Sequence, residues 1–369
     1  MHPLNRAEIV TIAGLAATAV AAGTIAIAQQ TIKKGASGQT ATRASGNAEL
    51  AAPLRSLLVE RQWMNTRPLA VADIRGKVVL VNFWTYSCIN SLRTLPYLRA
   101  WAERYRDRGL VVVGVHAPEF AFEHDSGNVR SALALLNLGY PIVLDNGFDI
   151  WRGFGNKAWP GFYLVDAKGQ VRHRAFGEGD YEVSERLIQR LLTEADGHAA
   201  TNDVGEIVGV GAQAAPDWDN IRSPETYIGY AQAHNFASDG GMRRDKSFVY
   251  RAESTPLTNQ WSLSGTWTVG SEFAAADRTS GAIAFRFHAR DLHLVLAPPG
   301  DGHSVRFRLT IDGKPPGSDH GADTDPNGWG TVKEPRMYQL VRQSGQISDR
   351  NFRIEFLSAG VRAYAFTFG

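Results

Sequence analysis

Cysteine is nearly absent from this chain of 369 residues, which contains only Cys88. A single cysteine excludes a disulfide bond within these residues, and it also excludes the zinc sites that need two or more thiolates. In an oxidising compartment a lone thiol is unusual, and reaction with a partner thiol or disulfide is the natural reason to keep one. We therefore expect protein or small-molecule thiols and disulfides as partners.

An excess of one charge is absent as well. The chain has 39 Lys and Arg residues against 37 Asp and Glu residues, for a formal net charge of +2. This balance provides no electrostatic basis for binding nucleic acid, and we expect no nucleic-acid partner. The hydrophobic share of 44% is typical of a folded globular protein, and the length is sufficient for two domains.

The first 48 residues have the pattern of an exported or anchored chain. Residues 9–28 carry no charge and follow Arg6, but they are rich in Ala, Gly and Thr and only weakly apolar. Residues 26–28, Ala-Ile-Ala, fit a signal-peptidase site. We interpret residues 1–29 as a signal peptide or membrane anchor and residues 30–48 as a flexible linker. This predicts an extracytoplasmic location, in the periplasm or cell envelope, with a membrane contact if the segment stays uncleaved.

Cys88 lies where a buried strand is expected to pass into a helix. Residues 78–83 are almost all apolar or β-branched, as in a strand buried on both faces. From about residue 88 to 106 the apolar residues recur every three to four positions, which predicts a helix. The first turn of a helix stabilises a thiolate through unpaired backbone N–H groups and the helix dipole. We therefore expect Cys88 to be a nucleophile with a lowered pKa.

This stretch resembles the thioredoxin-like family, most closely the TlpA and DipZ type of membrane-tethered, extracytoplasmic domains. The matching residues are Val81-Asn82-Phe83-Trp84, Cys88 and Leu95-Pro96. The resemblance implies a thioredoxin fold for residues 49–196. Family members have Cys-x-x-Cys, whereas this sequence has Cys88-Ile89-Asn90-Ser91, so a serine, natural or engineered, takes the place of the resolving cysteine.

Two polar residues are expected beside Cys88. A second apolar strand at residues 110–115 follows the cysteine helix, so the two strands should be parallel. Sites form at the carboxyl ends of such strands, which brings His116 and Glu119 close to Cys88 as candidates to tune or deprotonate its thiol. Alternatively, His116 caps the strand and Glu119 is solvated. Many family members have a glutamate six residues after the first cysteine, and Thr94 occupies that position here.

Trp159 and Pro160 precede another apolar strand. They match the loop with a cis proline that, in the resembled family, packs against the cysteine and pairs with a bound peptide. A proline at the start of a central strand requires an explanation, although an ordinary trans proline is the alternative.

The composition changes after residue 196. Residues 197–216 are rich in small residues and predict a linker, and residues 217–369 contain short alternating segments separated by turns, as in an antiparallel β-sandwich. Residues 223–230, 285–292 and 364–369 resemble the jelly-roll module of DipZ-type proteins, which is similar to carbohydrate-binding modules. The fold class is thus an α/β thioredoxin-like domain followed by an all-β jelly-roll sandwich.

A glycan is a possible partner of the second domain. Six aromatic residues could stack on sugar rings or belong to the core, and Trp329, in a polar loop, is expected to be the most exposed. These residues are Trp218, Tyr227, Tyr230, Trp261, Trp267 and Trp329. Residues 323–334 have acidic residues at the spacing of a calcium loop, but two prolines interrupt it, and we interpret it as a polar turn. We expect no metal and no cofactor.

The sequence therefore predicts thiol:disulfide exchange through Cys88 alone, with Ser91, Trp159, Pro160, Glu119 and His116 as the other site residues. Because Cys88 lacks an internal resolving thiol, an external thiol must release the mixed disulfide. One alternative is a peroxiredoxin-like thiol peroxidase, since Thr85-x-x-Cys88 matches part of that motif, although Val81 stands where its proline is expected. A second alternative is a non-catalytic glycan-binding protein on a degenerate thioredoxin scaffold.

Overall fold

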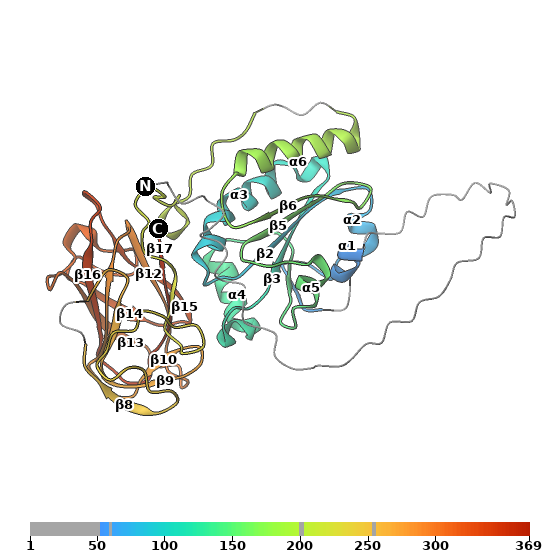
Figure 1. Cartoon of the computed structure of the whole chain (residues 1–369). Coiled ribbons are helices and arrows are strands. Elements are labelled where there is room, and N and C mark those ends of the chain that lie inside the picture. The colour runs from blue at the N-terminus through green and yellow to red at the C-terminus, as the bar shows by residue number, and fades with distance from the viewer. Residues whose placement is uncertain (1–51, 59–60, 199–202, 253–255) are drawn as a thin grey trace, which may run out of the picture.

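The computed structural model describes residues 52–58, 61–198, 203–252 and 256–369, so the predicted signal or anchor segment and the linker at 30–48 lie outside the described residues. The described part forms an α/β domain followed by an all-β domain, and the two lie side by side (Figure 1). Among the described helices, none has the length and apolarity needed to cross a membrane.

A six-stranded sheet forms the centre of the first domain, in the order β1-β4-β3-β2-β5-β6. The strands β2, β3 and β4 are parallel to one another, and the other neighbouring pairs are antiparallel. This arrangement confirms the expected parallel pairing across the cysteine helix. The strands are β1 (Trp63–Met64), β2 (Val78–Trp84), β3 (Leu110–His116), β4 (Ile142–Leu144), β5 (Gly161–Val165) and β6 (Val171–Phe176).

Helices cover both faces of this sheet (Figure 1). Side chains of a strand alternate between its two faces, so Val78 and Leu80 join the core with α3, α4 and α6, whereas Val79 and Val81 join the core with α1 and α5. All residues of β2 are buried, as expected for a strand covered on both sides. The helices are α1 (Ala52–Leu57), α2 (Val71–Ile74), α3 (Ile89–Arg104), α4 (Ser126–Leu135), α5 (Asp149–Phe154) and α6 (Tyr181–Asp196), with short 3₁₀ helices η1 (Arg106–Arg108) and η2 (Ala121–His124).

The second domain consists of antiparallel strands in two layers. The order is β14-β13-β16-β11-β9-β10-β17-β12-β15, with β7 beside β17 and β8 beside β9. The strands are β7 (Thr226–Tyr227), β8 (Ser247–Tyr250), β9 (Trp261–Val269), β10 (Ala274–Ala276), β11 (Gly281–Phe287), β12 (Asp291–Ala297), β13 (Val305–Ile311), β14 (Trp329–Val332), β15 (Arg336–Arg342), β16 (Arg350–Phe356) and β17 (Arg362–Phe368). The expected all-β class is confirmed.

Strand β9 belongs to both layers. Its first half, up to Ser264, pairs with β11, residues 265–268 pair with β8, and residues 267–269 pair with β10. Gly265, between the two halves, has φ +90°, a left-handed conformation that favours glycine. The two layers enclose a core that includes Trp261 and Trp267, so these two aromatic residues are structural.

The expectation that Trp329 is the most exposed aromatic of the second domain is wrong. Trp329 is half-buried, and the guanidinium groups of Arg306 and Arg308 lie over its ring at 4.9 and 5.3 Å from the ring centroid. Trp218 is 45% exposed. The difference arises because Trp329 begins β14, where its ring is covered by arginine side chains of the neighbouring strand β13.

The two domains share one apolar core. The apolar cluster that includes buried residues of α3 and α4 also includes residues of β7, β12, β15 and β17. Polar contacts accompany it: Arg93 Nη2 donates to the carbonyl oxygen of Phe368 at 3.1 Å, and the backbone N–H of Ala121 donates to Glu272 at 3.1 Å. The second domain is therefore docked on the side of the first domain where β2 passes into α3.

Candidate active site

Cys88 lies between β2 and α3, but it is the N-cap residue of α3 and not part of its first turn. Its backbone has φ −84° and ψ 118°, and its carbonyl oxygen accepts a hydrogen bond from the Leu92 N–H at 3.0 Å. The side chain is only 8% exposed. The position at the strand-to-helix junction is as predicted, and the burial is not.

The expected lowering of the Cys88 pKa is wrong for this arrangement. Burial raises the pKa of the Cys88 thiol, and the carboxyl groups of Glu119 and Glu225 raise it further. Hydrogen bonds from the backbone and side chain of Ser91 act in the opposite direction but are smaller. Glu225 belongs to the second domain, and it helps to keep the cysteine protonated. Sequence patterns near residue 88 give no information about this contact.

Ser91 is fully buried on α3, and its hydroxyl lies beside the sulfur. The Ser91 oxygen is also 3.5 Å from the backbone nitrogen of Thr85, which donates to it. A hydroxyl can donate to a thiolate but cannot form a disulfide. The geometry therefore gives Ser91 a stabilising role and leaves Cys88 without an internal resolving partner.

Glu119 contacts the second domain directly. The phenolic O–H of Tyr227, in β7, donates a short hydrogen bond to Glu119 Oε1. Burial raises the pKa of Glu119, and Glu225 raises it further; burial also raises the pKa of Glu225 to about 7. Because two neighbouring buried carboxylates disfavour double ionisation, this pair retains a proton near neutral pH. Glu119 is half-buried and bonded, so the alternative in which it is simply solvated does not describe it.

His116 ends β3 beside Trp84, as the parallel register of β2 and β3 requires. Its ring is stacked on Tyr86, with ring centroids 5.6 Å apart, and lies edge-on to Trp84 at 5.4 Å. Burial lowers the pKa of His116 to about 3, so the imidazole is neutral. Neither ring nitrogen has a hydrogen-bond partner within the described part of the chain. His116 therefore packs against Tyr86. Among the described residues, its ring interacts with Tyr86 and Trp84 and is not a cause of the shifted pKa of Cys88.

The peptide bond between Trp159 and Pro160 is cis, which confirms that expectation. Trp159 Nε1 donates to the carbonyl oxygen of Ala117 at 3.0 Å. This bond joins the proline loop to the segment that carries His116 and Glu119. Three chain segments predicted to form the site, at 85–91, 116–119 and 159–160, are thus connected by hydrogen bonds or ring contacts.

Glu123, in η2, is a site residue that sequence reasoning missed. One of its carboxylate oxygens accepts from Thr85 Oγ1 at 2.5 Å and Ser87 Oγ at 2.6 Å, and the other accepts from the backbone N–H groups of Glu119 and Phe120. Although burial raises its pKa, these four donors favour the carboxylate. Glu123 fixes the turn before Cys88 to the Glu119 segment. The sequence signal for this role was the acidic residue at position 123. It follows Phe120 by three positions, which is the spacing of a capping box.

The acidic loop at 323–334 is a turn in which the carboxylates of Asp323 and Asp325 are already engaged. Asp323 pairs with Arg336 at 2.6 Å, and Asp325 Oδ1 accepts from the backbone N–H groups of Asn327 and Trp329. Across the ranges that the structure describes, no group of three or more His, Cys, Asp and Glu residues is arranged to hold a metal ion. The interpretation as a polar turn fits this geometry.

Comparisons with known proteins match both domains. Residues 56–174 match the AhpC/TSA family, and residues 223–369 match a family described as "Thioredoxin like C-terminal domain". Protein DipZ of Mycobacterium bovis is 35% identical over 312 residues, which is 83% of this chain and 41% of that protein. The chain therefore spans less than half the length of this relative.

Two further similarities are confined to the first domain. The thiol-disulfide oxidoreductase YkuV of Bacillus subtilis is 28% identical over 148 residues, which is 40% of this chain and 99% of that protein. The solution structure of a thioredoxin-like protein in the oxidised form aligns with 41% of this chain and 100% of its own, at 27% identity and a TM-score of 0.36.

Proposed function

The chain belongs to the thioredoxin-like family, and from that premise we propose that it is an extracytoplasmic thiol:disulfide exchange protein in which Cys88 is the only reacting sulfur. The observation that carries the proposal is the position of Cys88 as the N-cap of α3 in the turn that follows β2, with Ser91 on the first turn of that helix acting to lower the pKa of its thiol. This effect of Ser91 favours the thiolate, which is the form of the sulfur that attacks a disulfide.

The exchange proceeds in two balanced steps. In the first, the Cys88 thiol gives its proton to water, and the thiolate attacks one sulfur of a substrate disulfide, so that a Cys88–substrate disulfide forms and the other substrate sulfur leaves as a thiolate. In the second, the thiolate of an external thiol attacks the substrate sulfur of this mixed disulfide and displaces Cys88 as a thiolate. Ser91 cannot perform the second step, so the external thiol determines the rate of release.

The described arrangement is the resting form of this cycle. Cys88 is covered, and its pKa is raised by burial and by two carboxyl groups, so it neither meets a disulfide nor ionises readily. The reaction therefore requires the segment that carries Glu225 and Tyr227 to move away from Cys88, whereas β15 keeps its contacts with the first domain. In the open form the pKa of Cys88 falls, because its burial and the effect of Glu225 are both removed.

The extracytoplasmic location is supported by the sequence pattern of residues 1–29. It is also supported by the single cysteine, because a lone thiol in an oxidising compartment can react with the disulfides of partner proteins. The peroxidase alternative is less well supported. Thr85 Oγ1 donates its proton to Glu123 at 2.5 Å, so this hydroxyl is not a donor to Cys88.

The test is capture of a small disulfide by the full chain. We expect 5,5′-dithiobis(2-nitrobenzoate) to form one mixed disulfide with the native protein and none with the Cys88→Ser variant, and we expect reduced glutathione to release it. If the native chain forms no adduct although the urea-unfolded chain is fully labelled, the exchange function is refuted.

A further inference from the structure

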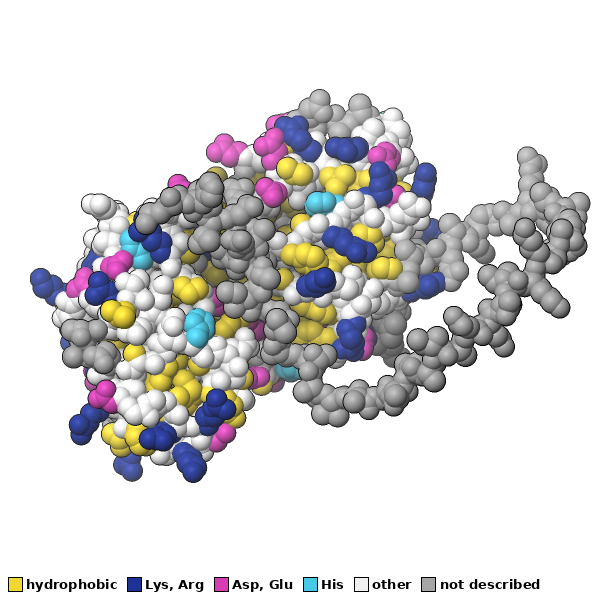
Figure 2. Space-filling view, viewed as in Figure 1, with side chains coloured by type: hydrophobic (Ala, Val, Ile, Leu, Met, Phe, Trp, Pro, Cys, Tyr) yellow, Lys and Arg dark blue, Asp and Glu magenta, His cyan; other side chains and the backbone are white. Residues whose placement is uncertain are grey.

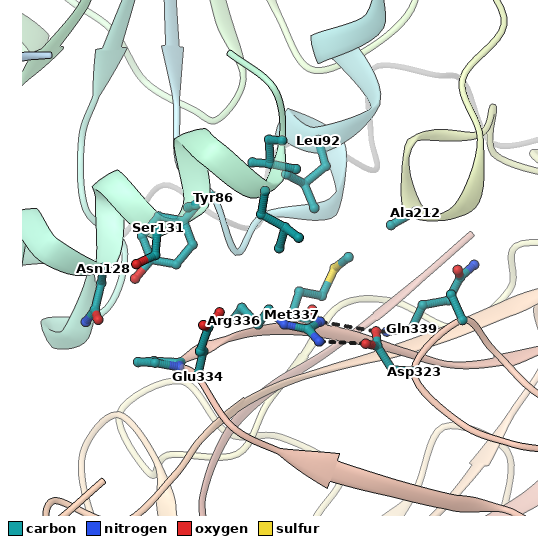
Figure 3. Close-up of a pocket in the computed structure, with 15 residues that line it drawn as sticks. Tyr86, Leu92, Asn128, Ser131, Ala212, Asp323, Glu334, Arg336, Met337 and Gln339 are labelled. Atoms are coloured by element: carbon teal, nitrogen blue, oxygen red, sulfur yellow. Dashed lines mark hydrogen bonds and ion pairs between the residues drawn. The ribbon is translucent and has the colours of Figure 1, made fainter. Parts of the chain in front are cut away.

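A cavity of about 150 Å³ lies between the two domains, next to the turn that carries Cys88. Tyr86 of that turn, Leu92 of α3 and residues of α4 line it from the first domain, Ala212 lies at one side, and Met337 of β15 lies opposite (Figure 3). Tyr86 precedes the cysteine by two residues, and Leu92 follows it by four. The cavity is therefore lined by residues that flank Cys88 in the sequence on both sides.

The lining of the cavity is mostly apolar, with a buried hydroxyl that has no partner. The side chains of Leu92, Leu136 and Met337 contribute apolar surface, and methionine adapts its shape to different occupants. Tyr86 is only 4% exposed, and its hydroxyl makes no hydrogen bond to any described residue. A buried hydroxyl without a partner costs about 1–3 kcal/mol. An occupant with a carbonyl oxygen would accept from this O–H and remove that cost.

The volume indicates the size of the occupant. An apolar protein cavity of about 150 Å³ is large enough to bind benzene. The side chains of leucine and phenylalanine are of similar size, and burying one of them contributes about 1.5–3 kcal/mol. A peptide offers such a side chain together with a backbone carbonyl, which matches both features of the cavity.

The charges at the rim indicate the neighbouring residue of that peptide. Asp323 is paired with Arg336, so these two side chains contribute no net charge. Glu334 is exposed at the rim, and its carboxylate has no ion pair or hydrogen bond among the described residues. The opening is therefore negative on balance and favours a cation.

We propose that this interdomain cavity binds an apolar side chain of leucine or phenylalanine size from a peptide substrate in which a Lys or Arg follows that residue. Tyr86 donates to a backbone carbonyl of the peptide, and Glu334 faces the basic side chain. The proposal rests on the thiol:disulfide exchange function, for which it names the substrate class: cysteine-containing peptide segments with an apolar residue followed by a basic one. The second domain then contributes half of the recognition surface.

The experiment measures peptide binding without exchange chemistry. Fluorescence anisotropy follows a labelled acetyl-Gly-Ser-Leu-Lys-Gly-amide peptide, whose serine takes the place of the substrate cysteine, on the full-length Cys88→Ser protein. The Ala212→Leu variant fills the cavity and should weaken binding at least tenfold, because it excludes the apolar side chain. Tyr86→Phe should weaken it about fivefold through the lost hydrogen bond. Ala215→Leu, an exposed position of the same segment, is the matched control and should bind as the parent does.

The outcomes separate this proposal from the exchange function. Equal affinity of the Ala212→Leu and Ala215→Leu variants, equal binding of a peptide with Asp in place of Leu, or no binding at all would each overturn the cavity as a peptide site, even if Cys88 forms mixed disulfides. Binding that Ala212→Leu weakens, in a protein whose native form captures no disulfide, would support the cavity and refute only the exchange function.

Discussion

The hydrogen bond from Tyr227 to Glu119 joins the two domains over Cys88, and its removal should expose the thiol. The substitution Tyr227→Phe deletes the hydroxyl and retains the ring that packs near Phe120. Because the Glu119 and Glu225 carboxyl groups retain a proton between them near neutral pH, we count the bond as a neutral one of about 1 kcal/mol. Its loss should increase the open population about fivefold.

The rate of alkylation measures this population. In the closed form the sulfur is covered, so the rate constant for iodoacetamide at one fixed pH below 7, the same for all variants, is proportional to the open fraction. We expect Tyr227→Phe to react about fivefold faster than the parent chain. Tyr230→Phe is the matched control, since it removes a hydroxyl from the same segment that donates to Asp245, 2.9 Å away, within the second domain.

Two results would refute this reasoning. If Tyr227→Phe reacts no faster than Tyr230→Phe, the bond does not hold the segment of Glu225 and Tyr227 in its closed position. If the parent chain already reacts at the rate of an unfolded thiol, the second domain does not cover Cys88 in solution. Thermal unfolding of both variants shows whether a change in rate reflects opening of this segment or a loss of folding.

Three further substitutions test the site. Burial raises the pKa of Glu225 to about 7 from an ordinary 4.5, so the closed form is fully favoured below about pH 4.5 and loses stability as the pH rises towards 7; a fluorescence energy-transfer pair on the two domains should record this opening, and Glu225→Gln should flatten the profile. Ser91→Cys restores Cys-x-x-Cys and should form an internal disulfide with Cys88 and gain insulin reductase activity; two free thiols after treatment with oxidised glutathione would contradict this. Glu123→Gln places an amide against hydrogen-bond donors and should lower the free energy of unfolding in urea by about 1–3 kcal/mol, whereas the exposed Glu103→Gln should not.

Much of the first domain was predictable because its signals are local. The apolar run of β2 and the periodicity of α3 placed Cys88 at a strand-to-helix junction, and the parallel register brought His116 to the same end of the sheet. The cis peptide at Pro160 followed from the family resemblance of its loop. Each of these features depends on residues close in sequence or on one strand pairing.

The surroundings of the sulfur were not predictable in the same way. Glu225 and Tyr227 act on Cys88 from more than 130 positions further along the chain, and a pattern around residue 88 contains no information about their contact. A helix terminus favours a thiolate, but burial opposes it and is the largest cause of the raised pKa, with Glu225 of the second domain adding to it. His116 was placed correctly at the strand end, but the stacking of its ring on Tyr86, and hence its neutral state, depends on packing.

The apolar core shared by the two domains determines how the protein can be divided. Val295, Met337 and Tyr364 of the second domain belong to the same cluster as Leu92 and Leu95 of α3. A chain cleaved between residues 197 and 216 would leave each half with an uncovered hydrophobic face, and such faces cause self-association. The isolated halves are therefore poor substitutes for the intact molecule in any screen for inhibitors or interaction partners, and calorimetry of the intact chain should show one melting transition shared by both domains.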